Sequence, residues 1–152
     1  MSHGNIPQIP LKTVRVLVTG AGGPAAVSVM KSLSADSSVH IIAADMDPWA
    51  AGLYLVPPAA RTLIPAGLDP GFVEAALARC IAMGVDVLIP TVDAELRPLG
   101  RARADFSMAG TELLLAPDQA LEVTLDKLAL AQCCAGHLRV PRTERLDQVA
   151  DP

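Results

Sequence analysis

The chain is poor in aromatic residues, and its core cannot be built around them. Among its 152 residues, aromatic side chains make up 3%, with one tryptophan, one tyrosine and two phenylalanines. The hydrophobic content is nevertheless 51%, so the core must be assembled from Ala, Val, Leu and Ile. A chain of this length is most simply one domain with a core of ordinary size.

The chain also lacks long apolar runs and basic clusters. No apolar run reaches the roughly 18–20 residues that a membrane-spanning helix needs. The opening segment, MSHGNIPQIPLKT, has no apolar region of the kind found in signal peptides. The formal net charge is -4, and basic residues gather only loosely at residues 97–103. An acidic chain without a basic patch gives no electrostatic footprint for nucleic acid or an anionic membrane, so we expect neither partner.

Cysteine and histidine are scarce as well. The three cysteines are Cys80, Cys133 and Cys134, an odd number with two adjacent, which is not a disulfide framework. This usage suits a reducing compartment, and we expect a cytoplasmic protein. The three histidines form no pattern with the cysteines at metal-ligand spacing. We therefore predict no metal site within this chain.

Short apolar runs alternate with longer helical patterns. The continuous apolar run VRVLVT, at residues 14–19, is typical of a strand buried in a parallel sheet. Strand–helix–strand alternation predicts an α/β fold, a Rossmann-like open parallel sheet with helices on both faces. Strands are expected at residues 14–19, 39–44, 61–64, 86–90 and 111–115, and helices at 24–35, 70–83, 95–106, 117–121 and 126–135.

Particular residues mark where the helices should begin and end. Asp47, Asp69 and Asp126 each stand where a helix N-cap is expected, and the first two are followed by proline. Gly84 is placed to end the helix that Asp69 opens.

The loops after the first, second and fourth strands are expected to meet at one edge of the sheet, where parallel α/β sheets bind ligands. They read GAGGPA, ADMDPWA and TVDAEL. The first fits the dinucleotide motif G-x-G-x-x-G/A between a strand and a helix, and Asp45 stands where a ribose-binding acid would be. Glycines allow close approach of a ligand, and free helix N–H groups favour an anion. Pro24, however, removes one of these N–H groups.

Three interpretations of the glycine turn follow: a pyrophosphate site, a contact to another small ligand, or a tight connection without a ligand. Asp93 and Glu95 can be explained as a helix cap and a first-turn acid. Two acidic loops beside one glycine turn would also form a pocket for an amine or a hydroxyl-bearing ligand. Spacing alone does not show that the carboxylates converge, so no catalytic residue is predicted.

Taken in order, the motifs resemble the N-terminal, pre-ATP-grasp domain of ATP-grasp ligases, particularly the carbamoyl-phosphate-synthase-like members. The resemblance rests on VLVTGAGGPAAVSVMKSL, DMDPWAAGLYL, DPGFVEAAL, DVLIPTVDAEL, DK and VPRT, which follow one another between residues 14 and 143. It implies a pre-ATP-grasp domain at residues 14–122. A disordered lead-in at 1–13 would precede it, and a linking helix with the start of an ATP-grasp domain would follow at 123–152.

Such ligases use ATP and Mg²⁺ to convert a carboxylate into an acyl phosphate, which an amine or similar nucleophile captures. The resemblance implies that this chain forms one wall of the substrate site and does not bind a dinucleotide. It also implies that Lys127 reaches the ATP phosphates. The residues implied to approach the substrate are Gly22, Gly23, Pro24, Asp45, Asp93 and Glu95.

After VPRT the family continues into an ATP-clamping domain, whose lysine, glycine-rich loop and Mg²⁺-binding acids are not recognisable here. We therefore expect ATP and Mg²⁺ to serve the complete enzyme, with a small carboxylate or amine as substrate, and this chain alone to be inactive. An apolar patch around Leu128, Leu130 and Cys134 should dock on an ATP-clamping domain or subunit, or drive self-association. The alternatives are a stand-alone NAD(P)-binding Rossmann module and a non-catalytic binding domain.

Overall fold

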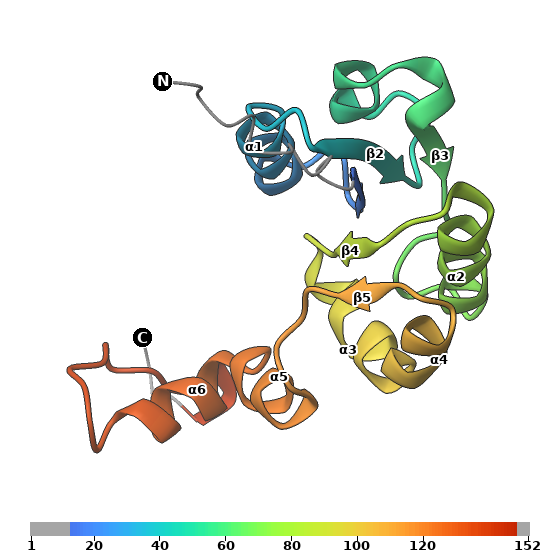
Figure 1. Cartoon of the computed structure of the whole chain (residues 1–152). Helices are drawn as coiled ribbons and strands as arrows, with labels where there is room; N and C mark the ends of the chain where they lie inside the picture. The colour runs from blue at the N-terminus through green and yellow to red at the C-terminus, as the bar shows by residue number, and fades with distance from the viewer. Residues whose placement is uncertain (1–12, 149–152) are drawn as a thin grey trace, which may run out of the picture.

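The computed structural model describes residues 13–148, in which five strands form one parallel sheet (Figure 1). The strand order is β3-β2-β1-β4-β5, and every neighbouring pair is parallel. The predicted α/β, Rossmann-like parallel sheet is thereby confirmed. The strands are β1 (Val14–Val18), β2 (Val39–Asp45), β3 (Arg61–Leu63), β4 (Val87–Ile89) and β5 (Glu112–Leu113).

Helices cover both faces of this sheet, as the sequence predicts. One face carries α1 (Pro24–Leu33) with the short 3₁₀ segments η1 (Ala51–Leu55) and η2 (Pro58–Ala60). The other face carries α2 (Phe72–Met83), α3 (Asp93–Arg101) and α4 (Arg103–Met108). After β5, α5 (Asp118–Thr124) and α6 (Lys127–Cys134) lead away from the sheet (Figure 1), and η3 (Leu146–Gln148) ends the described chain.

Successive residues of β1 pack on opposite faces, which explains why the strand is apolar throughout. Leu17 joins a core with Phe72 and Phe106, the two phenylalanines of the chain, all fully buried. Val18 joins the core on the other face with Met30 of α1. A strand covered on both faces has no solvent side and needs no polar alternation.

The helix that was predicted to begin at Pro70 begins two residues later. The carboxylate of Asp69 accepts the N–H of Gly71 at 2.7 Å, and Gly71, not Asp69, is the N-cap of α2. This short-range bond closes a turn ahead of the helix in place of capping it. The predicted end is confirmed, because Gly84 has the left-handed φ of 60° that favours glycine at this position.

The single helix predicted at residues 95–106 is wrong, because the chain forms two helices there. Ala102 has φ of -96° and ψ of 8°, which separates α3 from α4. The first of the two begins at Asp93, and its N-cap is Val92. Asp93 therefore lies inside the first turn and does not cap the helix.

Some expectations about the chain's organisation are not tested by the structure. The predicted boundary after residue 122 falls within α5, and the division into domains stays a prediction. Residues 1–12 and 149–152, which hold most of the predicted lead-in and the last predicted residues, lie outside the described residues. In the part that is described, no helix is long and apolar enough to cross a membrane.

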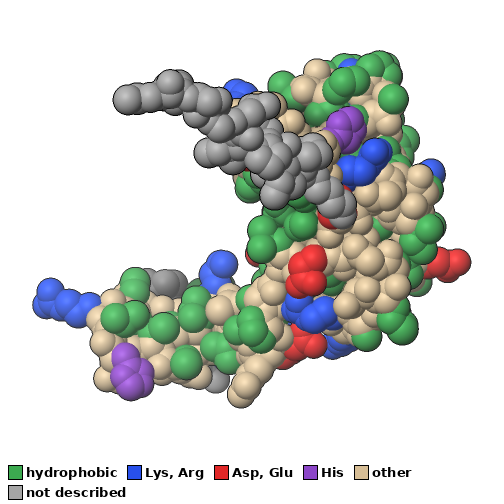
Figure 2. Space-filling model, viewed as in Figure 1, with side chains coloured by type: hydrophobic (Ala, Val, Ile, Leu, Met, Phe, Trp, Pro, Cys, Tyr) green, Lys and Arg blue, Asp and Glu red, His purple; other side chains and the backbone are tan. Residues whose placement is uncertain are grey.

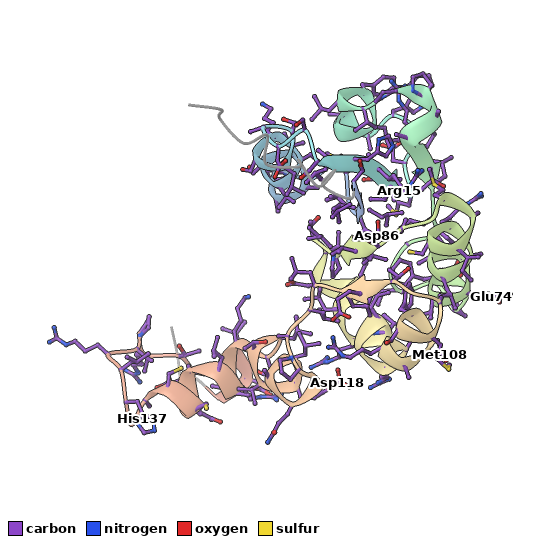
Figure 3. All side chains as sticks on the ribbon, viewed as in Figure 1. Arg15, Glu74, Asp86, Met108, Asp118 and His137 are labelled. Atoms are coloured by element: carbon purple, nitrogen blue, oxygen red, sulfur yellow. The ribbon has the colours of Figure 1, made fainter. Side chains whose placement is uncertain are left out.

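Two residues of α4 test where the core lies. Replacing the buried Phe106 by Ala should lower the free energy of unfolding by about 3–5 kcal/mol, because it leaves a cavity between α4 and the sheet. Met108 is 80% exposed and points outward (Figure 3). Replacing it by Ala should change the free energy of unfolding by less than about 0.5 kcal/mol. Urea denaturation of both variants measures the difference, and equal losses would contradict this core.

Candidate functional site

A cleft of about 860 Å³ opens at the carboxyl ends of β1, β2, β3 and β4. Its walls come from the segments 20–25, 45–51, 65–68 and 91–95. Strand order reverses at β1, which lies between β2 and β4. Such a switch point is where open parallel sheets bind ligands, and the volume is typical of a small-molecule site.

Five of the six residues expected to approach a substrate line this cleft. The exception is Asp93, which is exposed and lines an adjoining pocket of about 510 Å³ together with Arg97. Lys127 is exposed at the start of α6 and lines neither pocket. Contact of these residues with a ligand stays a prediction. The five that share the cleft are Gly22, Gly23, Pro24, Asp45 and Glu95.

The glycine turn after β1 has a fixed backbone shape. Gly20 adopts a φ of 62°, and a Cβ there would lie 2.5 Å from Cγ2 of Val92. Both the left-handed conformation and the contact require glycine. Thr91 also holds the start of this turn, because its hydroxyl donates a hydrogen bond to the carbonyl of Thr19 at 2.8 Å.

The backbone donors of this turn are used within the protein. Ala21 donates its N–H to a carbonyl of β2 at 3.1 Å, and Gly23 donates to the carbonyl at the start of the turn at 2.8 Å. Gly22 donates to the carboxylate of Asp45 at 2.7 Å. Pro24, the next residue, has no N–H. Four consecutive positions therefore offer no free N–H to a bound anion.

Asp45, at the end of β2, joins two loops of the cleft. Its Oδ2 accepts the N–H of Gly22, and its Oδ1 accepts the N–H of Asp47 at 2.9 Å. The residue is 9% exposed. Each carboxylate oxygen therefore accepts one backbone N–H, and each keeps capacity to accept a further hydrogen bond from a ligand.

The predicted helix cap at Asp47 is wrong. Its carboxylate accepts the N–H of Trp49 at 2.9 Å, which closes a local turn. The helical segment that follows is the short η1, and its N-cap is Ala50. The segment from Asp47 to Ala50 thus forms part of the cleft wall.

Glu95 is the buried acid of the cleft, with 5% of its surface exposed. Its Oε2 accepts the hydroxyl of Thr19, and its backbone N–H donates to the carbonyl of Val92 at 2.9 Å. Burial raises the pKa of Glu95, and the negative charge of Asp45 raises it further, while the Thr19 hydrogen bond acts in the opposite direction. A Cβ on Gly67 would lie 2.8 Å from Cγ of Glu95, so the loop after β3 packs directly on this side chain.

Sequence reasoning missed the loop after β3 and the two threonines. Residues 65–68 follow the parallel strand β3. They therefore lie at the same edge of the sheet as the loops after β1, β2 and β4, which were predicted to form the site. Thr19 is fully buried at the end of the apolar β1, and Thr91 follows β4. A threonine within two residues of the end of an apolar strand was the available signal for both.

The chain belongs to the PylC-like N-terminal domain family, whose model matches residues 16–114. This is the N-terminal domain of ATP-grasp-related enzymes, so the predicted relationship to ATP-grasp ligases is confirmed at that level. The closer likeness to carbamoyl phosphate synthase stays a hypothesis. No curated protein sequence matches the chain.

The chain is similar to parts of longer proteins of known structure, and the first of these shows the same fold. Glycinamide-RNase-transformylase T from Mycobacterium tuberculosis has a TM-score of 0.58 and 21% identity, over 82% of this chain and 35% of that one. The enzyme WbmG from Bordetella bronchiseptica, solved with NAD and UDP, has a TM-score of 0.45 and 17% identity, over 64% of this chain and 35% of that one. The dTDP-glucose 4,6-dehydratase from Bacillus anthracis, solved with NAD, has a TM-score of 0.49 and 15% identity, over 82% of this chain and 51% of that one. The chain thus spans about a third to a half of their lengths.

The described residues do not fit a Mg²⁺ site. Between residues 13 and 148, no group of three or more His, Cys, Asp or Glu side chains could hold a metal ion. Asp45 and Glu95 share a cleft but are occupied by backbone N–H groups and a hydroxyl, respectively. The expectation that ATP and Mg²⁺ bind only in a complete enzyme stays a prediction.

Replacing Glu95 by Gln should change how stability depends on pH. Burial lets the folded protein hold the Glu95 proton more tightly than the unfolded chain does. Wild-type stability therefore falls as pH rises from the ordinary value of 4.5 through the raised pKa of the folded state, and the variant lacks this loss. As pH rises through this range, the unfolding free energy of Glu95→Gln should therefore increase relative to that of the wild type.

Denaturation at about pH 4 and about pH 8 measures this shift. Glu74→Gln is the control, since that side chain is exposed and points outward from α2 (Figure 3). A pH-independent difference between wild type and Glu95→Gln would contradict a buried, proton-retaining carboxyl.

Proposed function

We propose that this chain is the acceptor-side domain of an ATP-grasp ligase, and that its cleft binds the small molecule whose amine captures an activated carboxylate. The family match and the position of the cleft at the switch point support this proposal. The observation that carries it is the charge of the lining. Asp45, Asp47 and Glu95 contribute three carboxyl groups, and no Lys, Arg or His is among the described lining residues.

This lining suits a hydrogen-bond donor and opposes a phosphate. An ammonium or hydroxyl group can donate to carboxylates, and a charged pair of this kind is stronger than a neutral hydrogen bond. A pyrophosphate would bring negative charge against three acidic side chains, at a turn whose N–H groups are already bonded within the protein. Like charges in a partly buried site repel strongly. The dinucleotide interpretation is therefore the weaker one.

The two buried acids are well held for binding an acceptor. Asp45 is fixed by two backbone donors, and Glu95 is fixed by the Thr19 hydroxyl. Groups that are already oriented need little rearrangement when a ligand binds. Because the described residues offer no Mg²⁺ ligand set, activation of the carboxylate is assigned to an ATP-clamping domain.

The C-terminal arm, formed by α5 and α6, is proposed as the surface on which that domain docks. No residue of α6 is buried, and Asp126 caps the helix by accepting the N–H groups of Leu128 and Ala129. Hydrophobic side chains lie along this arm (Figure 2). Leu130 is 36% exposed, and the predicted patch around Leu128, Leu130 and Cys134 awaits a binding test, as does the proposed reach of Lys127 to ATP.

The test joins the chain with the ATP-clamping domain of a PylC-like ligase and measures ADP release for a panel of amine acceptors. Acceptor-dependent turnover is expected from the pair and not from this chain alone. Glu95→Gln should lower kcat/KM for the acceptor at least about tenfold, because it removes the carboxyl group that can carry negative charge opposite the acceptor's ammonium group. Glu74→Gln should leave kcat/KM unchanged. Equal kcat/KM values for the wild type and Glu95→Gln would contradict a role of the cleft in acceptor binding.

A second titration separates the alternatives. NADH added to this chain should show no enhancement of nicotinamide fluorescence, and micromolar binding would overturn the proposal in favour of a dinucleotide-binding module. A correctly assembled pair that hydrolyses no ATP with any acceptor would instead favour a non-catalytic binding domain.

A further inference from the structure

Exposed apolar side chains surround the mouth of the cleft. Trp49 is 80% exposed and Leu68 is 85% exposed, and Met46 and Val92 are also large hydrophobic residues left in water. They come from the loops that follow β2, β3 and β4, which are separate in the sequence. Large apolar groups gathered from three loops around one opening indicate a surface that becomes covered.

The described lining of the cleft lacks the basic side chains that bind a carboxylate most strongly. Its described lining has three acids and no base, and its turn offers no free N–H from residues 21 to 24. Arg97 lines the adjoining pocket instead, where its guanidinium pairs with Glu122 at 3.4 Å. A ligand in this cleft therefore meets negative charge inside and hydrocarbon at the rim.

We propose that the acceptor is an apolar amine, with its ammonium group on a hydrocarbon chain or ring and no free carboxylate on the adjacent carbon. This proposal rests on the proposed function, whose amine substrate it specifies. The ammonium group would donate to the carboxyl groups of Asp45 and Glu95, and the hydrocarbon would lie against Trp49 and Leu68. Tryptophan is also the side chain whose ring attracts cations best.

An α-amino acid fits this arrangement poorly. Its carboxylate is attached to the same carbon as the ammonium group and would be brought beside the same acids. Removing a carboxylate from water without a cationic partner is costly, and it is costlier beside other acids. A neutral amide or ester at that carbon carries no such charge and should be tolerated.

The chain contains a natural probe for this test, because Trp49 is its single tryptophan. We would titrate the full chain with pentylamine, with norleucine, which is pentylamine carrying a carboxylate on its first carbon, and with norleucine amide. Pentanol is the neutral control. Pentylamine and norleucine amide should alter the emission of Trp49, and norleucine and pentanol should bind at least about tenfold more weakly.

Three variants assign the binding to the cleft. Glu95→Gln should weaken pentylamine binding several-fold while leaving pentanol unaffected. Trp49→Leu, followed by calorimetry because the fluorophore is lost, should weaken binding of pentylamine by a few-fold. Glu74→Gln removes an exposed carboxylate on α2 and should leave every affinity unchanged.

The outcomes separate this proposal from the proposed function. If norleucine binds as tightly as pentylamine and Glu95→Gln weakens both, the apolar-amine class is wrong while an amine site stands. If no amine binds and NADH binds at micromolar concentration, the proposed function itself fails. If neither amines nor NADH bind, the apolar-amine proposal is overturned, and the acceptor panel with the joined ATP-clamping domain decides the function.

Discussion

The carboxylate of Asp45 is the interaction on which the cleft depends. It accepts the N–H of Gly22 from the loop after β1 and the N–H of Asp47 from its own loop, so a single side chain fixes two walls. The glycine motif makes this possible, because a Cβ on Gly22 would lie 3.2 Å from Cβ of Ala50, closer than most such contacts. An aspartate that sequence motifs associate with a ribose here supports the backbone that lines the cleft.

The charge of the cleft follows from this use of the backbone. Once the turn has bonded its N–H groups internally, the side chains that line the cavity are mainly the acids, Thr91 and an apolar rim. Glu95 adds a buried carboxyl whose pKa is raised by desolvation, held by Thr19 beneath the loop that contains Gly67. A Rossmann-like fold is thus combined with an acidic cleft, for which we propose a ligand that donates hydrogen bonds.

The sheet could be predicted from the sequence because its strands are apolar on both faces, and the meeting of three loops at one edge follows from parallel topology.

The helix starts and the bonding of the glycine turn could not be predicted, because they depend on competition between short-range hydrogen bonds. The carboxylates of Asp47 and Asp69 close turns where helix caps were predicted, because the same group can do either. The internal bonding of the glycine turn could not be foreseen, since a motif states which residues occur and not where their N–H groups point. Asp93 was grouped with Glu95 for the same reason, although the first turn of α3 directs them to different pockets.

The most direct test is amide hydrogen exchange of the glycine turn, measured by NMR with and without inorganic pyrophosphate. If Asp45 and the neighbouring carbonyls occupy the turn, the amides of Ala21, Gly22 and Gly23 should exchange slowly, and pyrophosphate should leave their chemical shifts unchanged. Fast exchange together with large shifts on adding pyrophosphate would show that the donors are free. The turn would then be an anion site, and the account of an acidic acceptor cleft would be wrong.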